Sequence, residues 1–230
     1  MRKLFLTPFL FLALGHSVVA FDLFRPDLWF APASCPMAAP DISIQIGRSE
    51  VLIDHTLDYR SIDVIARDLK GAVMAGWRTN GLAAAQLKSD GETMVRILQR
   101  SDGKWCGYVA EGVFRIGYED PMRIYISSDY PVGGCAYNAI LGHELQHVDI
   151  YRSVLSAHLD DAAEHLVERF LNHGAVIANT WEDVSMALEE VVDNMVNEIV
   201  DGIVNESKIR NAALDTPANY VQVQSTCQDW

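Results

Sequence analysis

The clearest chemical pattern in the sequence is a pair of histidines and a glutamate within five positions, His143-Glu144-Leu145-Gln146-His147. On a helix, histidines four residues apart point from one face, one turn apart. Two imidazoles at that spacing can bind one tetrahedral zinc ion at about 2.0–2.1 Å. Glu144 lies beside the first histidine, where its carboxylate can take a proton from water that the metal activates. The motif therefore predicts one zinc ion per chain, with His143 and His147 as ligands and Glu144 as a general base.

A site of this kind needs a third protein ligand, which the motif does not contain. On one unbroken helix Glu164 would lie about 25 Å beyond His147, at a rise of about 1.5 Å per residue, and could not reach. If the next helix packs back as a hairpin with its turn near residue 177, Glu206 lies opposite His147. We therefore favour Glu206, with Asp215 second, followed by Glu198 and Glu164. A solvent-exposed helix acid is an equally good interpretation of Glu206.

The elements around the motif have the pattern of two long helices. Apolar residues recur every three or four positions over residues 137–174, which predicts one long helix or two nearly collinear ones. Thr180, followed by two acids, has the pattern of the next helix start, and that helix would end near residue 213, before Pro217. Two long helices joined by a short loop pack antiparallel. The motif is thus expected on the first arm of a C-terminal helical hairpin.

The chain before the motif is rich in strand signals. Alternating or β-branched segments occur at residues 41–46, 50–54, 93–98, 105–117 and 122–126. Helical spacing over residues 61–75 predicts one helix among them. The predicted fold is therefore α+β, with a small, mostly antiparallel sheet packed against the long C-terminal antiparallel helical hairpin that carries the HExxH motif.

The N-terminus has the three parts of a secretory signal: a basic start, the apolar run Leu4–Leu14, and small residues up to Ala20. The apolar run is too short to span a bilayer. We predict a signal peptide at residues 1–20, an extended proline-rich leader at 21–40, and a zincin-like hydrolase domain at 41–230. The protein is then exported to the periplasm or secreted, with no stable membrane anchor after signal cleavage.

Composition limits the partners. Half of the 230 residues are hydrophobic, which is typical of a globular chain with one sizeable core. The formal net charge is −13, and a chain this acidic repels phosphate backbones and anionic membranes. Nucleic acid is therefore excluded as the expected partner.

The four cysteines are Cys35, Cys106, Cys135 and Cys227. An even number in an exported chain predicts two disulfides, and the sequence leaves the three pairings open. The spacing contains no CxxC, so these residues do not predict a cysteine zinc site.

The five-residue motif resembles the zinc-binding helix of zincin-type (HExxH) metallopeptidases. The wider arrangement resembles a bacterial family of secreted zinc-dependent proteases of unknown function, in which a β-rich half precedes the motif helix and a helical hairpin. In that family an aspartate motif lies near the C-terminus, and residues 211–220 with Asp215 occupy this place here. The family's histidine and glycine after the aspartate are absent. The resemblance implies His143 and His147 as zinc ligands and Glu144 as the base.

These observations favour an exported zinc-dependent metallopeptidase acting on a peptide or protein substrate. A cell-wall amide is an alternative substrate for the same chemistry. The alternative of a different class is a non-catalytic exported binding or assembly protein whose metal site is structural or vestigial. Glu144 separates these classes, because catalysis needs its carboxylate and metal holding does not.

Overall fold

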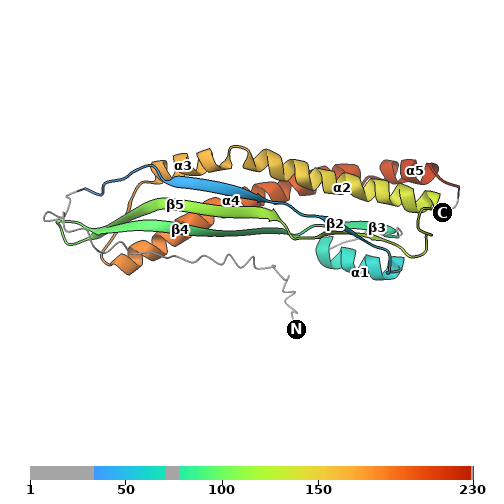
Figure 1. The fold of residues 1–230 in the computed structure, drawn as a ribbon, viewed down its shortest axis with the longest axis horizontal. Helices are drawn as coiled ribbons and strands as arrows, with labels where there is room; N and C mark the ends of the chain where they lie inside the picture. The colour runs from blue at the N-terminus through green and yellow to red at the C-terminus, as the bar shows by residue number, and fades with distance from the viewer. Residues whose placement is uncertain (1–33, 71–77, 229) are drawn as a thin grey trace, which may run out of the picture.

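The computed structural model describes residues 34–70, 78–228 and 230 (Figure 1). The predicted signal peptide at 1–20 and most of the predicted leader at 21–40 lie outside these residues. In the described part, seven strands and five helices form an elongated α+β arrangement. Two mixed sheets follow one another along the long axis, and helices lie over both of them.

The larger sheet contains the two long strands. Its order is β1 (Asp41–Gly47), β5 (Trp105–Tyr118) and β4 (Leu87–Gln99), and β7 (Val176–Ala178) pairs with the beginning of β5. β1 runs parallel to β5, whereas β4 and β7 run antiparallel to it. Side chains along β4 and β5 alternate between buried and exposed, so one face of this sheet belongs to the core.

The smaller sheet has the order β2 (Val51–Asp54), β6 (Met122–Ile126) and β3 (Gly81–Ala84). β2 is parallel to β6, and β3 is antiparallel to it and lies at an edge. α1 (Tyr59–Lys70) packs on one face, where its buried residues join Leu82 in a small cluster. The opposite face meets α2, so β3 is held between two helices (Figure 1).

The C-terminal half is mainly helical: α2 (Cys135–Leu159), α3 (Ala162–His173), α4 (Trp181–Leu214) and α5 (Pro217–Ser225). The Thr180 side chain accepts from the Asp183 N–H and begins α4, and the Thr216 side chain accepts from the Asn219 N–H and begins α5. α4 packs against α2 and across β4 and β5. The core between these layers contains fully buried side chains such as Phe114, Val154, Leu166, Val184 and Ile203.

The fold is α+β, but the predicted sheet and the predicted helical hairpin are both wrong. The strands form two mixed sheets with the parallel pairs β1–β5 and β2–β6, not one mostly antiparallel sheet. The C-terminal helices do not form a simple hairpin, because the first helical segment breaks at Asp160–Asp161 and the connection to α4 contains β7, which joins the sheet. Parallel pairing and a three-residue strand depend on distant partners, so local periodicity did not reveal them.

Two disulfides confirm the prediction from the cysteine count and settle the pairing. Cys35–Cys106 ties the segment before β1 to β5, and Cys135–Cys227 ties the first residue of α2 to the chain just after α5. They are separated by the length of the molecule, because β5 begins at one end and α2 begins at the other (Figure 1). Disulfides of this kind fit an oxidising compartment such as the periplasm or the extracellular space.

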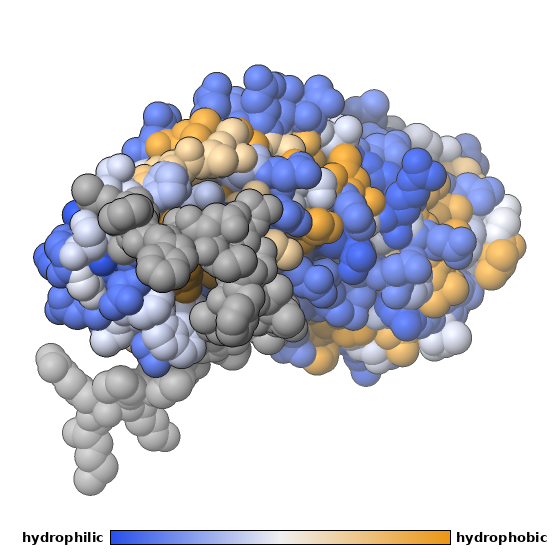
Figure 2. Space-filling model, turned by 60° about the vertical axis from the view of Figure 1, so that its left-hand side comes forward, coloured by the Kyte–Doolittle hydropathy of each residue, from blue (hydrophilic) through white to orange (hydrophobic). Residues whose placement is uncertain are grey.

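The surface view shows how hydrophilic and hydrophobic residues are distributed. Figure 2 shows a face that is mostly hydrophilic, with hydrophobic side chains in small groups between hydrophilic ones. None of the described helices combines the length and apolar composition that a membrane crossing needs.

Candidate metal centre

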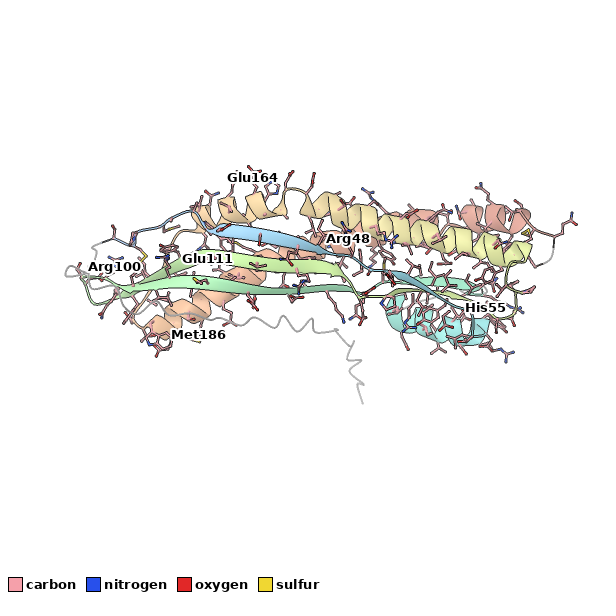
Figure 3. The ribbon with its side chains drawn as sticks, viewed as in Figure 1. Arg48, His55, Arg100, Glu111, Glu164 and Met186 are labelled. Atoms are coloured by element: carbon pink, nitrogen blue, oxygen red, sulfur yellow. A yellow bond between two sulfur atoms is a disulfide. The ribbon has the colours of Figure 1, made fainter. Side chains whose placement is uncertain are left out.

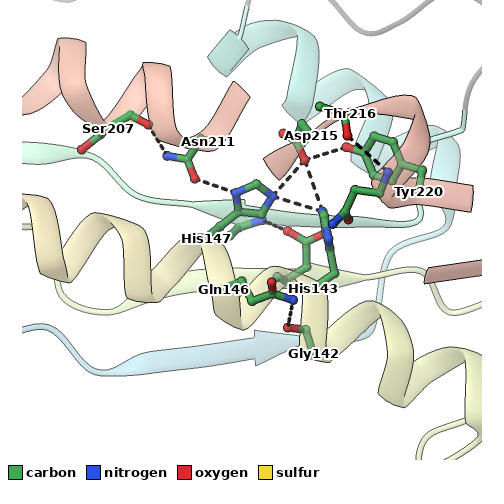
Figure 4. A network of polar contacts seen from close by, with 12 residues as sticks. Gly142, His143, Gln146, His147, Ser207, Asn211, Asp215, Thr216 and Tyr220 are labelled. Carbon is green, nitrogen blue, oxygen red and sulfur yellow. Dashed lines mark hydrogen bonds and ion pairs between the residues drawn. The ribbon is translucent and has the colours of Figure 1, made fainter. Parts of the chain in front are cut away.

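The motif residues point into the protein from α2. His143, Glu144 and His147 are only 5%, 5% and 3% exposed. Ionisable side chains are almost never this buried without a specific partner. Their partners come from β3 on one side and from the end of α4 and the beginning of α5 on the other (Figure 4).

Three atoms that can bind a metal converge at this point. Nε2 of His143 and Nε2 of His147 lie 3.2 Å apart. Oδ1 of Asp215, the residue that ends α4, lies 3.2 Å from the first nitrogen and 3.0 Å from the second. Ligands of a tetrahedral zinc ion at about 2.0–2.1 Å lie about 3.3 Å from one another. The three atoms therefore already have nearly the spacing of one face of such a tetrahedron, and the triad can hold a metal ion.

The orientation of His147 is fixed by a chain of hydrogen bonds. Asn211 Nδ2 donates to the carbonyl oxygen of Ser207 at 2.7 Å, which leaves Asn211 Oδ1 as an acceptor. His147 Nδ1 lies 2.6 Å from that oxygen and must donate to it. In the neutral imidazole the lone pair is then on Nε2, the atom that faces His143 and Asp215. A histidine held in this way is prepared to bind a cation through Nε2.

The electrostatics of the triad also favour a cation. Burial lowers the pKa of His147, but the hydrogen bond to Asp215 and the charges of Glu144 and Asp215 outweigh it, so the pKa is raised overall. Without a cation, a carboxylate oxygen and two imidazole nitrogens lie within 3.2 Å of one another and need a proton between them. A metal ion between the three atoms would supply the positive charge in place of that proton.

Tyr220 adds a hydroxyl to the centre. Its OH donates to Oδ1 of Asp215 at 2.7 Å, and its ring lies 5.3 Å from the ring of His143. Burial, together with the hydrogen bond to Asp215 and the nearby carboxylate charges, raises the pKa of Tyr220, so the phenol keeps its proton. The hydroxyl is thus a permanent donor beside the proposed ligand oxygen.

Glu144 lies beside the triad but is held by another element. Its Oε2 accepts a hydrogen bond of 2.7 Å from the backbone N–H of Ala83 on β3. Its charge nevertheless raises the pKa of both His147 and Tyr220, which places the carboxylate within electrostatic reach of the triad.

One ring nitrogen of His143 has no hydrogen-bond partner among the residues that the structure describes. This atom, Nδ1, is buried. His143 is therefore held less firmly than His147, by its Nε2 contacts and by the rings of His147 and Tyr220.

The other predicted third ligands lie elsewhere. Glu206, the favoured candidate, accepts from His158 at 2.7 Å and pairs with Arg210. Glu198 pairs with Arg169 on the surface, and Glu164 points away from the protein on α3 (Figure 3).

The helix register explains this outcome. The break between α2 and α3, together with the insertion of β7, shifts α4 along α2, so that Asn211 rather than Glu206 lies opposite His147. Asp215, the second candidate, then follows one helical turn later at the triad. Sequence reasoning did not select Asn211. The Thr216-Pro217 helix start would have shown that Asp215 lies at a helix junction rather than on a continuous helix.

No family model, curated protein or solved structure matches this chain. The resemblance to zincin metallopeptidases therefore rests on the five-residue motif, and the functional argument depends on the geometry of the site.

Proposed function

We propose that the protein is an exported zinc-dependent hydrolase, most consistent with a metallopeptidase. The observation that carries this proposal is the convergence of His143, His147 and Asp215, whose ligand atoms lie 3.0–3.2 Å apart beside the carboxylate of Glu144. Two imidazoles and one carboxylate are a common ligand set for catalytic zinc, which keeps its fourth position for water or substrate.

Each residue around the metal position then has a role. His143, His147 and Asp215 hold the ion, and Asn211 keeps Nε2 of His147 directed at it. Glu144 takes the proton from the attacking water and passes it to the leaving group. Tyr220 keeps its phenolic proton and donates it to Oδ1 of Asp215, which orients the third ligand. A peptide bond is the favoured substrate, and a cell-wall amide would use the same groups.

Export is part of the same proposal. The sequence pattern of residues 1–20 indicates secretion, and the two disulfides support an oxidising destination. Zinc is proposed rather than a harder ion such as magnesium or calcium, because imidazole nitrogens suit zinc and other transition metals better.

The second candidate is a non-catalytic exported binding protein with a structural metal. Burial of all three motif residues, and the hydrogen bond that engages Glu144 with Ala83, are features that such a site would share. A structural zinc site has four protein ligands, however, and the described residues bring three such groups together here. The catalytic proposal is therefore favoured.

The test compares the purified protein with His147→Ala and Glu144→Gln. Metal content is measured by mass spectrometry, and hydrolysis is followed on fluorescently labelled casein. We expect about one zinc ion per chain in the wild type and in Glu144→Gln, and little in His147→Ala. Hydrolysis should be lost in both variants.

The outcomes separate the two functions. A folded wild type that takes up no stoichiometric metal overturns both the hydrolase proposal and the structural-metal alternative. Stoichiometric metal with casein hydrolysis unaffected by Glu144→Gln overturns Glu144 as the base. Stoichiometric metal with no hydrolysis of casein or of a peptide library favours the binding protein.

A further inference from the structure

Strand β3 approaches the motif helix unusually closely at Gly81. A Cβ atom on this residue would lie 2.5 Å from Cγ2 of Ile140 and 2.6 Å from Oε1 of Glu144. Real Cβ atoms do not come this near to their neighbours, so any larger residue would force α2 or the Glu144 side chain to move. The glycine is needed here for close approach rather than for an unusual backbone conformation.

Two positions further along the same strand, the backbone holds the other oxygen of Glu144. The N–H of Ala83 donates to Oε2 at 2.7 Å. Among the described strands β3 is at the edge of its sheet and pairs with β6 alone, and its outer backbone donor is directed at α2. The Glu144 carboxylate therefore has Oε1 against Gly81 and Oε2 bonded to Ala83, and the strand fixes its position from one side.

We propose that Gly81 and Ala83 of β3 are positioning residues for the general base Glu144. This inference rests on the proposed function, since it gives Glu144 a catalytic task. Gly81 allows α2 to approach, and the Ala83 N–H then holds the Glu144 carboxylate in one place on the helix turn between His143 and His147. A glutamate side chain has three rotatable bonds and would otherwise sample several directions. The short strand supplies the rigidity that general-base geometry requires.

The contact also explains why β3 lies between two helices. Leu82, between the two positioning residues, is 2% exposed and points to the opposite face, where it packs with Ile62 and Ala66 of α1. Side chains alternate across a strand, so anchoring Leu82 in α1 keeps residues 81 and 83 turned toward α2. The packing of Leu82 against α1 thus helps to keep β3 in the orientation that contacts Glu144.

The test uses three substitutions in the full-length protein. Gly81→Ala adds the colliding methyl group, and Ala83→Pro removes the N–H donor without adding a methyl group at position 81. Gly142→Ala is the matched control, because it lies on α2 beside the motif and a Cβ there meets nothing within 4 Å. Each is made in the wild type and in Glu144→Ala.

The first readout is the visible spectrum of the cobalt-loaded protein as a function of pH. A carboxylate beside the metal disfavours loss of a proton from solvent bound there, so Glu144→Ala should lower the spectral midpoint by roughly one pH unit. Gly81→Ala and Ala83→Pro should shift the midpoint in the same direction and no further. Neither should shift it in the Glu144→Ala background, and Gly142→Ala should not shift it in either background.

The second readout is thermal unfolding of the metal-free protein, which needs no metal and no substrate. Gly81→Ala should lower the midpoint in the wild type and lower it less in Glu144→Ala, where one collision partner is gone. Equal losses in both backgrounds overturn the contact between Gly81 and Glu144.

The outcomes separate this inference from the proposed function. If the wild type binds no cobalt, the proposed function and the positioning role fall together. If cobalt binds but Glu144→Ala leaves the pH midpoint unchanged, Glu144 is not the base and has no role to be positioned for. If Glu144→Ala shifts the midpoint while Gly81→Ala and Ala83→Pro do not, the positioning role alone is overturned.

Discussion

Nδ1 of His147 lies 2.6 Å from Oδ1 of Asn211, and this single bond determines which imidazole nitrogen faces the metal position. The amide cannot rotate, because its Nδ2 is bonded to the carbonyl of Ser207 in the preceding turn of α4. Through the Asn211 side chain, the packing of α4 against α2 therefore sets the orientation of His147.

Replacing Asn211 by alanine should weaken zinc binding by about 10–100-fold, the usual effect of removing a hydrogen bond to a ligand histidine. His147 would lose the acceptor that holds its Nδ1 proton, and both tautomers and ring orientations would be populated. Zinc affinity is measured by competition with a chromophoric chelator. Asn205→Ala, at an exposed position of the same helix, is the control. Equal affinities for the two variants would show that Asn211 does not orient the ligand.

Asp215→Asn should reduce zinc content well below one ion per chain, because it removes the negative charge from the third ligand. Glu206→Gln should retain stoichiometric zinc, since Glu206 pairs with His158 and Arg210 instead. Both substitutions exchange a carboxylate for an amide on the same stretch of chain, so metal analysis compares them directly. Loss of zinc in Glu206→Gln, with retention in Asp215→Asn, would show that Glu206 is the third ligand, as the sequence analysis favoured.

The two disulfides should differ in their effect on the metal. Cys135–Cys227 joins the beginning of α2 to the chain after α5, and α5, which follows the proposed ligand Asp215, carries Tyr220. Its removal by a double serine substitution should weaken zinc binding. Removal of Cys35–Cys106 should not, because that bond lies at the opposite end of the molecule.

Both double variants should lose stability, by about 2–5 kcal/mol, the usual effect of removing a native disulfide. Urea unfolding of the metal-free proteins measures that loss, and chelator competition measures the affinity. Equal weakening of zinc binding in both double variants would mean that the metal centre responds to global stability rather than to the attachment of α5.

The sequence predicted the parts of the site that depend on local geometry. His143 and His147 point from one face because four residues make about one helical turn, whatever the rest of the fold does. The residue that lies beside these two histidines depends on how α4 is aligned along α2, and that alignment follows from the break at Asp160–Asp161 and from β7. Neither feature has a periodic signal, so the predicted register placed Glu206 where Asn211 lies.

The same distinction explains the fold. β1, β2, β4, β5 and β6 lie at or around segments that the residue pattern predicted, since alternation and β-branched residues are local properties. β3, β7 and α5 were not predicted. β3 and β7 are short and are stabilised mainly by their partners, β6 and β5. The sequence did not single out Gly81, because the need for a glycine at this position arises from the close approach of α2 in the folded chain.

The metal-free protein should lose stability as the pH rises. The folded-state pKa of His147 lies above its ordinary value of 6.5, so the folded chain binds this proton more tightly than the unfolded chain. The resulting stability is fully present below the unfolded pKa and disappears as the pH rises through the folded pKa. Thermal midpoints of chelator-treated protein between about pH 6 and about pH 9 should therefore fall.

Zinc reverses the sign of this dependence. The ion replaces the proton at Nε2 of His147, so zinc binding releases the proton and becomes stronger at higher pH. Zinc-loaded protein should gain stability relative to the metal-free form over the same range. Metal-free His147→Gln is the control, because it lacks the titrating group and should not show the fall. A chelator-treated wild type whose midpoint stays level or rises with pH would contradict a protonated His147 at the centre of the metal-free triad.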